Sequence, residues 1–164
     1  RHAHIARRGQ FAGVEEFEIA CACSLLVRSR VVEDIGPLPT DYFVYWEDVD
    51  WSGMAAAAGW KILFVPRSRV WHASGASLNS AVGPPQLLRN RYEVRNRILY
   101  HRRHRPGRLP GVAWSVVVNA ARMFLSREWR PMARAHWRGL RDGLLGRTGQ
   151  IDGPALVNQA PRPA

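Results

Sequence analysis

One stretch, Asp41 to His72, constrains this chain more than any other, because it joins an acidic cluster to a helix and two short strands. Glu47, Asp48 and Asp50 lie within four residues and are surrounded by tyrosine, phenylalanine and tryptophan. Carboxylates this close repel one another, so each needs solvent, a hydrogen bond or a cation. Two interpretations are open. The acids cap the start of a helix, where the helix dipole favours negative charge, or they form a catalytic site.

The alanine-rich run after the acids predicts a helix over residues 49–58, with Asp48 as its N-cap and Gly59 at its end. A short apolar strand is expected at residues 62–65, closed by proline, and a second at residues 69–71. The second strand would deliver His72 back toward the acids. A histidine after a strand is more often a hydrogen-bonded structural residue than a metal ligand, so both roles are weighed for it.

The rest of the chain divides at its glycines and prolines. A strand is expected near residues 19–27 and a short helix over residues 29–35, capped by Ser29 and ended by Gly-Pro. Three further helical segments are expected. The first starts at Pro84 or Pro85 and runs to about residue 104, and the others cover residues 112–125 and 128–145. Cys21 and Cys23 would point to one face of the first strand, as small buried residues in a reducing compartment, because a disulfide across one residue is sterically unfavourable.

Several of these segments, taken in order, resemble the acceptor-side half of a family 2 glycosyltransferase of the rhamnosyltransferase-like branch. The similarity covers about residues 20–105 and includes segments 21–28, 32–36, 42–51 (YFVYWEDVDW), 58–60, 65–66, 70–72 and the Arg95-Asn96-Arg97 triplet. Cys21 stands where the family has glycine, and Met54 stands where it usually has arginine. The latter difference removes one expected contact to a phosphate or an acid.

The resemblance implies an α/β fold: the C-terminal part of a GT-A nucleotide-sugar transferase domain over residues 1–105, followed by a helical amphipathic tail over residues 106–164. The family's nucleotide-binding strands and its DxD metal motif do not occur in the sequence. Asp48-Val-Asp50 spells DxD, but its position after Tyr-Trp-Glu assigns it to the acceptor side. The chain is therefore expected to be a fragment of a larger enzyme, and a poor catalyst alone.

The implied reaction is inverting transfer of a sugar from a nucleotide-sugar donor to the hydroxyl of a saccharide or lipid-linked acceptor, as in the synthesis of cell-surface polysaccharides. Asp48 would be the general base, and Glu47 and Asp50 would orient the acceptor or that base. His72 would complete the coordination of a divalent metal, Mg or Mn, whose other ligands lie in the missing N-terminal half. The residues expected to bind substrate are Trp46, Trp51, Arg95 and Asn96.

The charge distribution supports an anionic partner. Residues 1–50 carry nine acids and five arginines, a net charge of −4, whereas the remainder carries four acids and nineteen basic residues, a net charge of +15. A basic half suits a phosphorylated substrate, an anionic membrane or nucleic acid. A basic nucleic-acid-binding or membrane-surface module is the alternative function. Nucleic acid is not favoured, because no known nucleic-acid motif occurs and the acidic cluster would have no role.

The last two helical segments carry three tryptophans, Trp114, Trp129 and Trp137, together with Arg130, Arg134, Arg138 and Arg141. This pattern is typical of a helix at a membrane interface, but packing against another part of the enzyme explains it equally well. The apolar run at residues 112–125 is too short for a spanning helix. We expect a cytoplasmic protein attached peripherally to the inner face of the plasma membrane.

Overall fold

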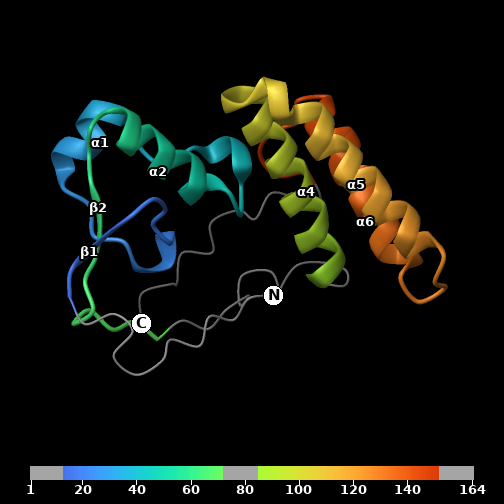
Figure 1. Ribbon diagram of the computed structural model, residues 1–164, viewed down its shortest axis with the longest axis horizontal. Coiled ribbons are helices and arrows are strands. Elements are labelled where there is room, and N and C mark those ends of the chain that lie inside the picture. Colours follow the sequence, from blue (N-terminus) through green and yellow to red (C-terminus); the bar gives the residue numbers. More distant parts are fainter. Residues whose placement is uncertain (1–12, 72–84, 152–164) are drawn as a thin grey trace, which may run out of the picture. The chain divides into compact units, whose positions relative to one another are not determined.

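The computed structural model describes residues 13–71 and 85–151, and its elements form two compact units (Figure 1). Unit 1 consists of residues 13–39 and 48–71. Unit 2 consists of residues 40–47 and 85–151. The chain thus contributes a short segment to unit 2, returns to unit 1, and then completes unit 2, so each unit is built from two separate parts of the sequence.

Unit 1 contains a small antiparallel sheet. Strand β1 (Glu15–Phe17) pairs with β2 (Ile62–Phe64), with Glu15 opposite Phe64 and Phe17 opposite Ile62. The rings of Phe17 and Phe64 lie 5.5 Å apart, centroid to centroid. Two strands of this length have little stability of their own, so this aromatic pair and the packing around it hold the sheet together.

Three helical elements complete unit 1: η1 (Ala22–Ser24), α1 (Ser29–Ile35) and α2 (Glu47–Ala57), whose first residue belongs to unit 2. Helix α1 ends at Gly36, whose φ of 81° lies in the left-handed region that glycine adopts without strain. The indole N–H of Trp51 donates to the carbonyl oxygen of Gly36 over 2.8 Å. This bond fixes α2 to the end of α1.

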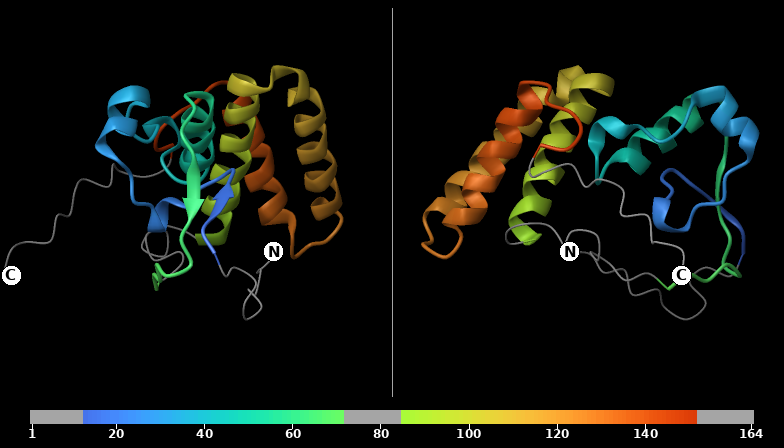
Figure 2. Two further views of the ribbon diagram at one scale, coloured as in Figure 1. Left: turned by 60° about the vertical axis from the view of Figure 1, so that its left-hand side comes forward. Right: turned by 180° about the vertical axis from the view of Figure 1, so that it is seen from behind.

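Unit 2 is a group of three long helices with short helical turns at two places. Its elements are η2 (Thr40–Tyr42), α4 (Pro85–His104), η3 (Pro106–Arg108), α5 (Leu109–Phe124) and α6 (Arg130–Leu144). Figure 2 shows α4, α5 and α6 side by side in both views. Their shared core consists of Val94, Ile98, Val112, Val116 and Leu140, with Leu109, Ala113 and Val117 packed against it.

Two glycines bring α6 unusually close to α4. A Cβ atom at Gly139 would lie 2.5 Å from the carbonyl oxygen of Arg91, and one at Gly143 would lie 2.6 Å from Cβ of Ile98 and 2.8 Å from the carbonyl oxygen of Arg95. All three distances are shorter than real Cβ contacts. The four-residue spacing puts both glycines on one face of α6, so the backbones of the two helices meet there.

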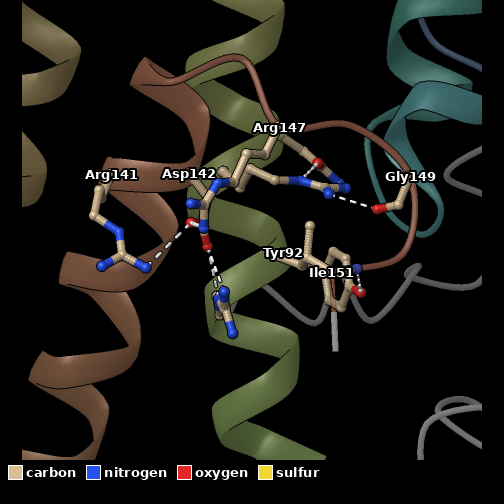
Figure 3. A network of polar contacts seen from close by, with 9 residues as sticks. Tyr92, Arg141, Asp142, Arg147, Gly149 and Ile151 are labelled. Carbon is tan, nitrogen blue, oxygen red and sulfur yellow. Dashed lines mark hydrogen bonds and ion pairs between the residues drawn. The ribbon is translucent and has the colours of Figure 1, made fainter. Parts of the chain in front are cut away.

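A buried carboxylate provides the polar link between the same two helices (Figure 3). Asp142 on α6 is fully buried, and its Oδ2 accepts hydrogen bonds from Nε and Nη2 of Arg91 on α4, at 2.8 and 2.6 Å. Nη1 of Arg147 donates to Oδ1 at 3.0 Å. A buried charge is tolerated only when it is paired and hydrogen-bonded in this way.

The structure confirms the helices expected from the sequence at residues 29–35, 49–58, 85–104, 112–125 and 128–145, with ends shifted by a few residues. The strand expected at residues 62–65 is also present, as β2. Together these elements make residues 13–71 and 85–151 mostly helical, with one small sheet. Among the described residues, no helix is both long enough and apolar enough to cross a membrane.

Three local predictions are wrong. The strand expected near residues 19–27 is absent: β1 precedes it, and a 3-10 turn occupies residues 22–24. Residues 69–71 are not a strand, since no neighbouring strand pairs with them in the described part of the chain. Cys21 and Cys23 are exposed rather than buried, because the 3-10 turn lies at the surface of unit 1.

The boundary expected between residues 105 and 106 lies inside unit 2. Helix α4, assigned from the sequence to the transferase part, packs against α5 and α6, which were assigned to the tail. The physical reason is the glycine contact and the buried carboxylate on α6, which join this helix to α4 more closely than to α5.

Candidate functional site

The segment that precedes the acids, residues 43–46, has a strained backbone. Phe43, Tyr45 and Trp46 have φ angles of 61°, 65° and 76°, in the left-handed region that residues with a Cβ rarely adopt. Each such residue costs about 1–2 kcal/mol relative to the right-handed region. Three of them in four positions persist only where surrounding contacts determine the backbone, which is typical of functional sites.

Asn96 supplies most of those contacts. Its side-chain amide nitrogen donates to the carbonyl oxygens of Tyr42, Val44 and Tyr45, at 3.1, 2.7 and 2.8 Å. Asn96 is fully buried on α4. One amide group thus binds three carbonyl groups within residues 42–45, because its two hydrogens are shared among three acceptors.

Arg95, the preceding residue of α4, is also fully buried. Its Nη2 donates to the carbonyl oxygen of Tyr42 and its Nη1 to that of Gly149, both at 2.6 Å. Its Nε donates to Oδ1 of Asn96 at 2.7 Å, which orients the asparagine amide toward the strained segment. Together, Arg95 and Asn96 form what we call the loop clamp.

Aromatic rings cover the clamp. Phe43 packs on Tyr92 with ring centroids 5.2 Å apart, and the guanidinium of Arg95 lies 4.7 Å from the centroid of Tyr92. Trp46 packs on Tyr100 at 5.3 Å. These contacts orient the side chains of the strained segment along α4 and exclude water from the clamp, which strengthens its hydrogen bonds.

His101 lies beside Trp46, with ring centroids 6.4 Å apart. Partial burial lowers the pKa of His101 below its usual range, and the positive charges of Arg97, Arg105 and Arg108 lower it further. The imidazole is therefore neutral at pH 7, which is compatible with its position against the indole ring.

The acids follow immediately, at the start of α2. Glu47 is the first residue of this helix and is half-buried. Asp48 is also half-buried. Its Oδ1 accepts a hydrogen bond from the backbone N–H of Val49 at 2.9 Å, and its Oδ2 accepts a longer one from that of Ala22 at 3.4 Å. Asp48 is thus inside the first turn rather than the N-cap, where the helix dipole still favours its negative charge.

Asp50 and Trp51, later on α2, are both buried. Asp50 is 1 % exposed and Trp51 is 6 % exposed, with its indole bonded to Gly36 as described. Of the two tryptophans expected to contact a substrate, Trp51 is therefore a core residue here. Trp46 is half-buried against Tyr100 in unit 2.

The predicted metal ligand His72 lies outside the described residues. Within residues 13–71 and 85–151, no three histidine, cysteine or acidic side chains are arranged to hold a metal ion. The described residues therefore do not supply a coordination sphere by themselves.

The sulfur atoms of Cys21 and Cys23 lie 3.2 Å apart as free thiols. The pKa of the Cys23 thiol is raised, mainly by its hydrogen bond with Cys21.

The sequence prediction paired Arg95 and Asn96 with substrate, whereas their observed contacts are with the backbone of residues 42–45 and 149. It did not identify Phe43, Tyr45 or Trp46 as strained. The buried Arg91–Asp142 pair was also missed, although a lone acid within the arginine-rich segment at residues 130–147 was a usable signal.

Compared with known proteins, the chain matches no protein-family model, no curated protein and no solved structure.

Proposed function

We propose that this chain is the acceptor-side part of an inverting family 2 glycosyltransferase with a GT-A domain. The observation that carries the proposal is the strained segment before α2, held by two buried residues of α4 and leading directly into the acids. A fold keeps strain of this size where a side chain must be held in a defined position. The segment and the clamp are also two of the motifs in which the sequence resembles this family.

In the proposed reaction Asp48 takes the proton from the acceptor hydroxyl. The oxygen forms a bond to the anomeric carbon of the donor sugar from the face opposite the leaving group, so the configuration inverts. The bond to the nucleoside diphosphate breaks, and the diphosphate leaves with the electron pair. The backbone amides of Val49 and Ala22 keep the carboxylate of Asp48 oriented for this step.

The neighbouring residues have supporting roles in the proposal. Half-buried Glu47 and buried Asp50 orient the acceptor or the carboxylate of Asp48. Arg95 and Asn96 act by positioning residues 42–46 rather than by touching the acceptor. A Mg or Mn ion would help the diphosphate to leave, with His72 among its ligands, but no step above depends on that ion.

The donor is a nucleotide-sugar and the acceptor a saccharide or lipid-linked saccharide of the cell surface. We place the reaction at the cytoplasmic side of the plasma membrane. Exposed aromatic and arginine side chains on unit 2 give a physical reason for attachment to that membrane.

The decisive test is Asp48→Asn in the full-length polypeptide that carries this sequence. Release of nucleoside diphosphate from a panel of nucleotide-sugars is measured with a mixture of saccharide and lipid-linked acceptors. Loss of a general base should lower turnover about 100-fold or more, while donor affinity measured by calorimetry stays nearly the same. The amide retains the hydrogen bond from Val49, so the helix start is preserved.

Asp34→Asn is the matched control, because Asp34 is an exposed carboxylate of the same unit and its bond from the Trp60 indole survives in the amide. This control should keep full turnover. If Asp48→Asn is as active as Asp34→Asn, Asp48 is not the base. If the unmodified polypeptide releases no nucleotide from any donor, the glycosyltransferase proposal itself fails.

A further inference from the structure

The turn that joins α5 to α6 exposes apolar side chains at the end of the helical hairpin. Phe124 is 40 % exposed, Trp129 is 49 % exposed and Leu125 is 88 % exposed. We call residues 121–130 the hairpin tip. Leu125 removes almost no apolar area from water when the chain folds. Three large apolar residues clustered at one turn mark an interaction surface.

The same turn is strongly basic. Arg122, Arg127 and Arg130 are exposed there, against a single acid, Glu128. Nε of Arg130 donates a long hydrogen bond, 3.4 Å, to the carbonyl oxygen of Phe124, which keeps this guanidinium beside the apolar residues. The arginines continue along the exposed side of α6 at Arg134, Arg138 and Arg141.

We propose that the hairpin tip docks on an anionic lipid surface, with Leu125, Phe124 and Trp129 in the headgroup region and the three arginines on lipid phosphates. The combination of side chains selects this partner. Nucleic acid would bind the arginines but leave the leucine in water, and an apolar protein groove would leave the cations unpaired. A bilayer interface of acidic lipids offers acyl chains and phosphates at the same depth.

The sequence suggested a membrane contact along the last two helical segments, whereas the structure favours the hairpin tip alone. Ala133 and Leu140 follow Trp129 at helical spacing and would form one apolar stripe with Trp137 along α6. Both are buried, and Leu140 lies in the core shared by the helices of unit 2. The length of α6 therefore cannot lie on a membrane with that stripe inserted, whereas the hairpin tip is accessible. The inference does not depend on glycosyl transfer, since it concerns residues remote in sequence from the acids.

The test is flotation of the full chain with vesicles of phosphatidylglycerol and phosphatidylcholine, and with vesicles of phosphatidylcholine alone. We expect binding to the acidic vesicles that falls with salt. The triple variant Arg122→Gln, Arg127→Gln, Arg130→Gln should bind on the order of 100-fold more weakly, at about fivefold per arginine. Leu125→Asp should weaken binding at least tenfold, because it introduces a charge at the inserted point.

Two control variants match these changes elsewhere in the chain. Leu26 is 99 % exposed, so Leu26→Asp makes the same replacement in unit 1. Arg30→Gln, Arg67→Gln, Arg69→Gln removes three exposed arginines from unit 1. Both controls should float like the unmodified chain. The proposal is overturned if the unmodified chain does not float, if the controls lose as much binding as the tip variants, or if duplex DNA binds equally well and Leu125→Asp has no effect.

Discussion

Replacement of Asn96 by alanine removes the centre of the loop clamp and should destabilise unit 2. The alanine leaves the carbonyl oxygens of Val44 and Tyr45 without the amide that binds them at 2.7 and 2.8 Å. The carbonyl oxygen of Tyr42 keeps its bond from Arg95. The Nε–H of Arg95 loses its acceptor, Oδ1 of Asn96, in a buried environment.

The magnitude follows from these losses. An unsatisfied buried donor or acceptor costs about 1–3 kcal/mol. Three groups are affected, but the carbonyls of Val44 and Tyr45 are only partly buried, so water recovers part of their hydrogen bonding. We expect the free energy of unfolding to fall by about 2–4 kcal/mol. Residues 43–46 should also relax toward negative φ, because the strain there is no longer compensated.

The assay is urea unfolding followed by circular dichroism, together with hydrogen exchange of the amides at residues 42–46. Asn90→Ala is the matched control, since Asn90 lies on the same helix and makes one exposed bond to the carbonyl oxygen of Gln86. That change should alter stability by less than about 0.5 kcal/mol. Asn96→Asp keeps an acceptor for Arg95 but removes the donors, and should therefore also be destabilising. If Asn96→Ala costs no more than Asn90→Ala, the clamp does not hold the strained segment.

Two further predictions concern the packing and charge of unit 2. Gly143→Ala should destabilise the chain by about 1–3 kcal/mol through overpacking against α4. Gly53→Ala is the control, because a Cβ at this position of α2 meets open space, and it should be neutral or stabilising. The urea midpoints of the two variants distinguish the effects. His101 has a lowered pKa in the folded chain, so the unfolded chain takes up its proton more readily. The free energy of unfolding should therefore fall as the pH drops below about 6.5. His101→Gln should show a smaller fall between about pH 7 and pH 5. Identical pH profiles of the two proteins would show that His101 does not cause the fall.

The helices could be predicted because their signals are local. Gly36 ends α1, Gly59 follows α2, and a proline begins α4, so the sequence itself marks where each helix starts or stops. The apolar run at residues 112–125 and the helical spacing of apolar residues at 128–145 likewise predict the last two helices. Such signals depend on a residue and its neighbours within a turn or two, which the sequence displays directly.

The strained segment could not be predicted for the opposite reason. Phenylalanine, tyrosine and tryptophan disfavour positive φ, so residues 43–46 carry no local signal for the backbone they adopt. Their conformation depends on hydrogen bonds from residues more than fifty positions later. For the same reason the Arg95-Asn96 pair resembled a substrate-binding motif: the sequence shows polar side chains but not the carbonyl oxygens that they meet.

The contacts of α4 explain why the two last helices belong with the candidate site. The face of α4 that carries Val94 and Ile98 packs against the glycines of α6, while the neighbouring residues Arg95 and Asn96 reach the strained segment. The carbonyl oxygen of Arg95 lies only 2.8 Å from where a Cβ of Gly143 would be. Helix α6 therefore packs directly against the backbone that carries the clamp. Segment 145–151 adds a second link, because Gly149 receives a hydrogen bond from Arg95 and its own amide donates to the carbonyl oxygen of Asp41. The helices after residue 105 thus determine the geometry of the segment that leads into the acids, and a boundary before them would separate the clamp from its support.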